Sequence, residues 1–209
     1  LIVLVFLLLL RLLALYSLEP DYNVSSDDVS YIQSGIYLMR HGTLIMHEEN
    51  PSAQVMPGMT VLTGLFYLFF GEGDSLWLAL KIFWILMGTL TAWVIYRAVC
   101  LFAPKWCGLV AMLPLFRADF IWMDNLILTE TPFHLALAAM IYYTLRMGKT
   151  GRWRDFYGCL LSYFAGLMLK ANIAPYPVFA LVYLLLKRYD RQKLAKQCAI
   201  VACAVLCFL

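Results

Sequence analysis

The sequence predicts an all-α protein: a polytopic bundle of about seven membrane helices with a large loop on the outer face. Its 209 residues are 63% hydrophobic and only 14% charged, whereas a soluble domain carries charge on about a quarter of its residues. The apolar runs are long and do not alternate with polar residues, which indicates helices rather than barrel strands. The third observation that supports this fold is the distribution of basic residues along the chain.

Seven of the eight apolar runs are assigned to membrane spans. The runs occupy residues 1–18, 57–70, 76–102, 106–123, 126–147, 156–170, 173–187 and 198–209. Run 57–70 has about 14 residues, whereas a span needs roughly 20, so we expect it to stay on the outer surface. The basic residues then collect on one side, which the positive-inside rule makes cytoplasmic together with the N-terminus. They are Arg97, Lys105, Arg146, Lys149, Arg152, Arg154, Lys187, Arg188, Arg191, Lys193 and Lys196.

The outer loop, residues 19–75, holds two predicted helices that are amphipathic or re-entrant. Ser25 or Ser26 can cap the first, and Gly42 is its predicted end. The first turn carries two acids, Asp27 and Asp28, which the helix dipole favours. Its apolar stripe repeats with helical spacing at Val29, Ile32, Ile36 and Met39. The second helix covers 58–70, between Pro57 and Gly71.

The chain begins and ends inside apolar runs, so we expect residues 1–209 to be the N-terminal part of a larger membrane domain. Its six cysteines lie outside the polar part of the outer loop and form no CxxC spacing, and we infer no disulfide framework.

The topology brings distant ionisable residues into one outer layer. Asp27 and Asp28 lie there, with Glu130 at the start of a later helix and Lys170 at the end of another. Charged residues at membrane depth are functional candidates, and several on one side indicate a polar cavity that opens outward. Arg117 and Asp119 belong to the same layer and are expected to solvate the end of a span.

Each candidate also has a purely structural interpretation. The acids can serve as helix-start residues, and Lys170 can extend its ammonium to the membrane interface. Tyr31 is either an interfacial aromatic or a ligand contact. His41 and His47 are expected in loops, with no partners at the spacing of a zinc site.

Four segments, in order, resemble the polytopic glycosyltransferases of the GT-C type. They are DDVSYIQSGIYLMRHG, PGMTVLTGLFYLFFGEGD, LTETPFHLAL and GLMLKANIAPYP. The branch they resemble contains the dolichyl-phosphate-mannose protein mannosyltransferases and the lipid A aminoarabinose transferases. The sequence departs from it in two places. Val55 and Met56 stand where aminoarabinose transferases have an acid-Lys pair, and Lys170 stands where many relatives have Arg, which binds phosphate with a different geometry.

The resemblance implies transfer of a sugar from a polyprenyl phosphate to a protein, lipid or glycan acceptor. In this interpretation Asp27 is the general base, and Asp28 is its helper or a ligand for a metal or the acceptor. Lys170 stabilises the leaving phosphate. Glu130 orients a substrate or holds Lys170, and Tyr31 contacts the substrate. No cofactor is identified, and a divalent metal stays open.

Two alternatives remain beside the enzyme. A transporter or lipid flippase would explain Arg11, which lies in the middle of the first span, although transporters place charges near the midplane of repeated halves. A non-catalytic relative that binds polyprenyl lipids is the other. All three are multi-pass proteins surrounded by membrane lipids, in the cell membrane or, alternatively, the endoplasmic reticulum, and none has a nucleic-acid partner.

Overall fold

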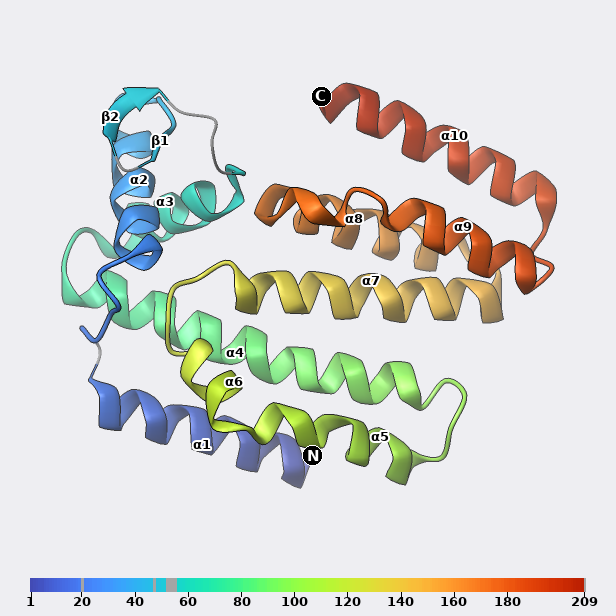
Figure 1. The fold of residues 1–209 in the computed structure, drawn as a ribbon, viewed down its shortest axis with the longest axis horizontal. Helices are drawn as coiled ribbons and strands as arrows, with labels where there is room; N and C mark the ends of the chain where they lie inside the picture. The colour runs from blue at the N-terminus through green and yellow to red at the C-terminus, as the bar shows by residue number, and fades with distance from the viewer. Residues whose placement is uncertain (20, 47, 52–55, 209) are drawn as a thin grey trace.

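The computed structural model describes residues 1–19, 21–46, 48–51 and 56–208, and these fold into a helical bundle (Figure 1). The long helices run side by side along the long axis of the molecule. Those of the main layer pack in the order α1, α4, α7 and α8. Their bounds are α1 (Ile2–Leu18), α4 (Asp74–Val99), α7 (Glu130–Thr150) and α8 (Trp153–Leu169).

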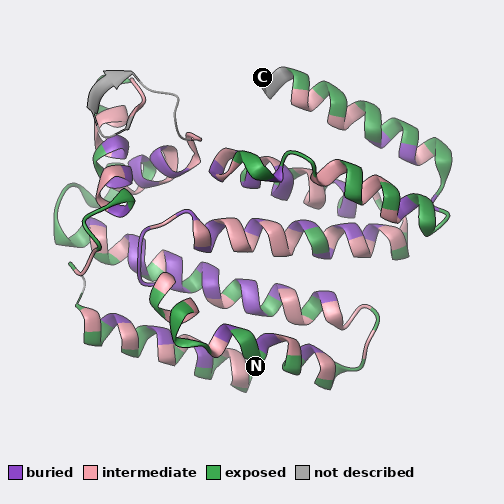
Figure 2. Ribbon diagram, in the orientation of Figure 1, coloured by how far each residue is buried: buried purple, intermediate pink, exposed green. Residues whose placement is uncertain are grey.

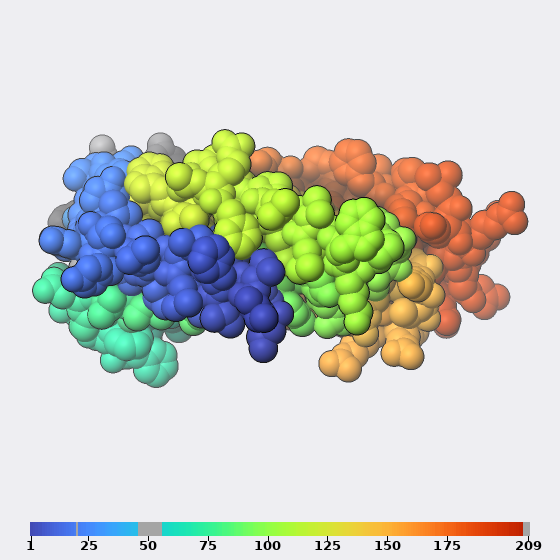
Figure 3. All heavy atoms as spheres, turned by 90° about the horizontal axis from the view of Figure 1, so that it is seen from below, coloured from blue at the N-terminus to red at the C-terminus, as the bar shows by residue number. Residues whose placement is uncertain are grey.

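Shorter elements complete the two sides of this layer. After α4, the chain returns beside α1 through α5 (Lys105–Met112), a 3₁₀ turn η1 (Leu113–Phe116) and α6 (Ala118–Met123). These elements and α1 form the face seen in Figure 3. On the other side, η2 (Ala171–Ile173) leads into α9 (Tyr176–Leu186), and α10 (Arg191–Phe208) follows as the outermost helix.

The predicted outer loop gathers at one end of the bundle, which we call the α2 end. It holds α2 (Asp27–His41), the antiparallel pair β1 (Ile45–Met46) and β2 (Glu48–Pro51), and α3 (Gly58–Phe70). The starts of α4 and α7 and the end of α8 lie at the same end (Figure 1). The opposite end, the basic end, holds the turns α4–α5, α7–α8 and α9–α10, and all the predicted cytoplasmic bases lie in or near these turns.

The structure confirms both predicted outer helices within a residue or two. Helix α2 ends at Gly42, whose φ of 70° is left-handed, and α3 ends at Gly71, also at φ 70°. Glycine adopts this conformation without steric cost. The expected serine cap is wrong, because Ser26 occupies the N-cap position without a side-chain capping bond. The β1–β2 pair was not predicted from the sequence.

Helix α3 packs closely on α2 because both present small residues. A methyl group on Gly35 would collide with Thr63 and the backbone of Gly64, so the two helices nearly touch at this point. Thr63 also donates a 2.8 Å hydrogen bond to the carbonyl of Tyr31. Both helices share a buried cluster with α4 that includes Met59, Leu80 and Trp84. Buried positions on all three helices are purple in Figure 2. This packing holds α3 against the α2 end.

Among the described residues, α4 is the one helix whose length and apolar composition suffice for a membrane span. The run 106–123, expected to be a span, is not one continuous helix, because the chain there forms α5, η1 and α6. Pro114 lies in η1, and Arg117 has an extended backbone between η1 and α6. A proline has no backbone N–H to donate and disfavours a continuous helix. The expectation of seven spans remains a prediction.

Candidate functional site

Glu130 and Lys170 form an ion pair at the α2 end. Glu130 is the first residue of α7, and Lys170 is the residue at which α8 ends in an extended backbone. The Lys170 Nζ lies 2.7 Å from Glu130 Oε1, and each side chain is about one-third exposed (33% for Glu130, 31% for Lys170). The ammonium also lies 5.8 Å from the centre of the Phe133 ring. The pair is therefore positioned by its surroundings and still accessible to a ligand.

Asp27 and Tyr31 belong to the same neighbourhood. Asp27 is exposed at the first position of α2, whereas Tyr31, one turn later, is buried. Burial raises the pKa of the Tyr31 phenol, and the negative charges of Asp27 and Glu130 raise it further, while a hydrogen bond with Thr129 opposes them. Asp27 and Glu130 thus both lie close enough to Tyr31 to raise the pKa of its phenol.

Asp28 has a structural environment that does not fit its predicted role as a catalytic helper or ligand. Its side chain is fully buried, and its carboxylate accepts hydrogen bonds from the backbone N–H groups of Val24, Ser26 and Val29 at 2.8–3.0 Å. A carboxylate with three backbone donors stabilises the turn that leads into a helix. Asp28 therefore fixes the turn before α2, and that turn presents Asp27.

Lys81 also supports this turn, and the sequence interpretation missed it. Its buried ammonium donates to the carbonyls of Glu19 and Tyr22 in the α1–α2 connection, at 3.3 and 2.5 Å. An ionisable residue in the middle of an apolar run was the available signal. Lys81 is a positioning residue, because it satisfies two carbonyls of the segment that precedes Asp27.

Arg11, the residue that suggested a transporter, forms a buried ion pair. Its Nε lies 2.6 Å from Asp124 Oδ2, with side-chain exposures of 1% for Arg11 and 7% for Asp124. Thr131 donates a 2.7 Å hydrogen bond to the other Asp124 oxygen. Space for the carboxylate comes from Gly88 of α4, where a methyl group would collide with it. The pair ties α1 to the connection between α6 and α7, which leads to Glu130.

The remaining candidates lie apart from this site. Arg117 and Asp119 pair with each other at 2.9 Å on the surface. His41 is the last residue of α2 rather than a loop residue, and its ring stacks on Tyr37. His47 and Val55 lie outside the described residues. Among the residues that the structure describes, no group of three or more His, Cys, Asp or Glu side chains could hold a metal ion.

An apolar groove lies between α3, α4, α7 and α8, with a volume of about 500 Å³. Its wall includes Pro132 and Leu169, which are close neighbours of Glu130 and Lys170 in sequence, although neither charged residue lines the groove. Leu62, Phe83 and further apolar side chains line the rest. An apolar groove and a nearby segment that carries a charged pair suit a ligand with a hydrocarbon tail and an anionic head.

The comparisons with known proteins agree with this chemistry. The family profile described as dolichyl-phosphate-mannose-protein mannosyltransferase matches residues 54–209, which is well over half of the chain. No curated protein and no solved structure matches the chain.

Proposed function

The chain belongs to the dolichyl-phosphate-mannose-protein mannosyltransferase family, which consists of membrane-bound GT-C-type glycosyltransferases, and from this premise we propose that it transfers a sugar from a polyprenyl phosphate at the α2 end. The Glu130–Lys170 pair, together with the apolar groove between α3, α4, α7 and α8, carries the proposal. The groove suits a polyprenyl chain, and the pair suits the phosphate of such a donor.

We propose that Lys170 binds the donor phosphate. When the sugar leaves, negative charge develops on that phosphate, and a nearby ammonium in a poorly hydrated site stabilises it. Glu130 holds the ammonium in place before the substrate binds. Two-thirds of the Lys170 side chain is shielded from solvent, which strengthens its interaction with an anion.

We propose Asp27 as the general base. It is the exposed acid of the pair that heads α2, whereas the Asp28 carboxylate is occupied by the backbone. Its carboxylate would take the proton of the acceptor hydroxyl as that oxygen attacks the anomeric carbon. The charges of both Asp27 and Glu130 raise the pKa of Tyr31, so we propose that Tyr31 lies near both and contacts the substrate.

The proposed membrane arrangement is the seven-span topology, with the α2 end outside the cell or inside the endoplasmic reticulum lumen. Asp27, Glu130 and Lys170 all lie at that end, and the opposite end carries the basic turns (Figure 1). The transporter alternative stays open; Arg11, the residue that suggested it, forms a buried ion pair with Asp124. Protein, lipid and glycan all remain candidate acceptors.

A transfer assay tests this function. Membranes containing the natural full-length protein receive labelled mannose on dolichyl or undecaprenyl phosphate, and label is followed into protein, lipid and glycan fractions. We expect Asp27→Asn and Lys170→Met each to lower transfer about 100-fold or more, since a general base or an electrostatic stabiliser commonly contributes that much.

Asp74→Asn is the matched control, because Asp74 is likewise an exposed acid in the first turn of a helix. It should leave transfer near the wild-type rate. Transfer that survives in Asp27→Asn would exclude this residue as the base. Absence of transfer from every polyprenyl donor in the wild-type protein would favour the non-catalytic lipid-binding relative.

A further inference from the structure

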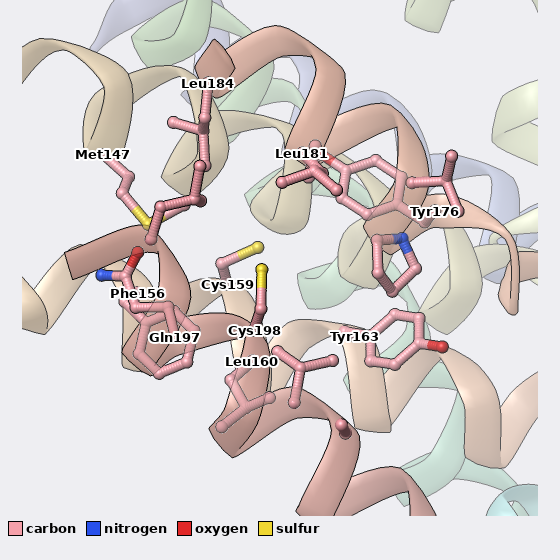
Figure 4. A pocket seen from close by; sticks show the side chains of 16 residues that line it. Met147, Phe156, Cys159, Leu160, Tyr163, Tyr176, Leu181, Leu184, Gln197 and Cys198 are labelled. Carbon is pink, nitrogen blue, oxygen red and sulfur yellow. The ribbon is translucent and has the colours of Figure 1, made fainter. Parts of the chain in front are cut away.

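A second cavity lies on the other side of the bundle, between α7, α8, α9 and α10 (Figure 4). Its volume is about 270 Å³, and its wall is almost entirely apolar. Met147, Phe156 and Leu184 belong to both this wall and a buried cluster that includes residues of α10. None of the residues in the proposed transfer site lines this cavity.

Basic residues lie where the helices that line the cavity end or begin at the basic end. Arg191 is the first residue of α10 and stands three positions before Leu194, which lines the cavity, so the two share one face of α10. Arg188 lies in the α9–α10 turn, two residues after the end of α9. Arg152 is the residue immediately before α8. Cations therefore lie beyond the cavity at the basic end of three of its four helices.

These cations are exposed and lack acidic partners. Arg152, Lys187, Arg188 and Arg191 are all exposed, and none forms an ion pair within the part of the chain that the structure describes. The acid in the α9–α10 turn, Asp190, accepts a hydrogen bond from the backbone of Lys193. The basic turn therefore carries a net positive charge directly beside an apolar cavity.

We propose that this cavity binds one acyl chain of an anionic phospholipid, whose phosphate contacts Arg188 and Arg191. The inference rests on the membrane location and goes beyond the proposed transfer reaction. The cavity is slightly smaller than the pockets of about 300–1,000 Å³ that bury whole small ligands, so it accommodates part of a lipid. Basic pockets between membrane helices are suited to acidic lipid head groups.

Lipid binding to the purified full-length protein tests the proposal. Native mass spectrometry in mild detergent would compare phosphatidylglycerol with phosphatidylcholine of the same acyl chains. We expect the anionic lipid to form the tighter one-to-one adduct. Each cation beside an anionic lipid contributes about fivefold in affinity, so the double variant Arg188→Gln, Arg191→Gln should bind phosphatidylglycerol about 25-fold more weakly.

The matched control for charge is the double variant Arg97→Gln, Lys105→Gln. It also removes two cations from the basic end, but near the α4–α5 turn, away from the cavity. It should retain phosphatidylglycerol binding. Equal affinity for the two lipids, or equal losses in the two double variants, would overturn the proposal.

A second pair of variants tests the acyl chain. Ala202→Phe should reduce binding of both lipids because Ala202 lines the cavity, whereas Ala199→Phe adds the same bulk on an exposed position of α10 outside the lining. Equal effects of the two variants would place the lipid elsewhere.

Two other results would contradict the proposal. Displacement of the lipid by inorganic phosphate would indicate a headgroup site alone, and no adduct in the wild-type protein would mean that another segment of protein fills the cavity. These measurements do not depend on sugar transfer, so each proposal can fail without the other.

Discussion

Two ion pairs of the bundle have nearly the same length and different surroundings. Arg11 and Asp124 are 2.6 Å apart and almost completely buried, whereas Glu130 and Lys170 are 2.7 Å apart and one-third exposed. A buried charge that loses its partner has no water to replace it, whereas a half-exposed one does. The comparison indicates that burial, rather than distance, separates a pair that holds the fold from a pair that can meet a substrate.

The largest expected effect comes from breaking the buried pair. Arg11→Met leaves the Asp124 carboxylate without its charged partner, and loss of one member of a buried pair costs about 3–5 kcal/mol of folding free energy. Thermal unfolding of the purified protein in detergent would measure it. The expected result is a large fall in Tm.

The double variant Arg11→Met, Asp124→Asn provides the control. Because asparagine has nearly the shape of aspartate and no charge, it removes the unpaired buried charge and should recover part of the lost stability. If the double variant is as unstable as the sum of the single ones, the two residues do not act as a pair, and the comparison fails.

Glu130→Gln should have the opposite profile. Its pair is half-exposed, so we expect a stability loss of less than about 1 kcal/mol. Transfer should fall about 10- to 100-fold, since Lys170 would no longer be held in place for the donor phosphate. The measurements are Tm in detergent and label transfer in membranes. A stability loss as large as that of Arg11→Met, with transfer reduced only in proportion to folded protein, would make this pair structural as well.

The sequence was a reliable guide wherever one local rule decided the structure. Glycines at 42 and 71 ended the two outer helices, and the basic residues sorted to one end as the positive-inside rule expects. The short run 57–70 forms the predicted helix, which packs on α2 through small residues of both helices; its place on the outer surface stays a prediction.

The partners of charged residues were harder to predict. Arg11 and Asp124 are 113 positions apart, and their contact depends on the space that Gly88 leaves in a third helix. The adjacent acids Asp27 and Asp28 look equivalent in sequence, yet helical geometry exposes one and directs the other toward three backbone N–H groups. Single-sequence patterns do not contain such long-range contacts, although they did identify the group of residues to examine.

The smallest effect should come from a third ion pair, which extends the comparison to the surface. Arg117 and Asp119 are 2.9 Å apart, with side-chain exposures of 69% and 51%. Water and salt screen such a pair, so Arg117→Gln should change stability by no more than about 0.5 kcal/mol and leave transfer unchanged. Tm in detergent and label transfer, both at low and at high salt, would measure these effects. A large, salt-insensitive loss of stability would show that solvent exposure does not determine how much each of the three pairs contributes to stability. The exposed Arg117–Asp119 pair would then behave like the buried Arg11–Asp124 pair.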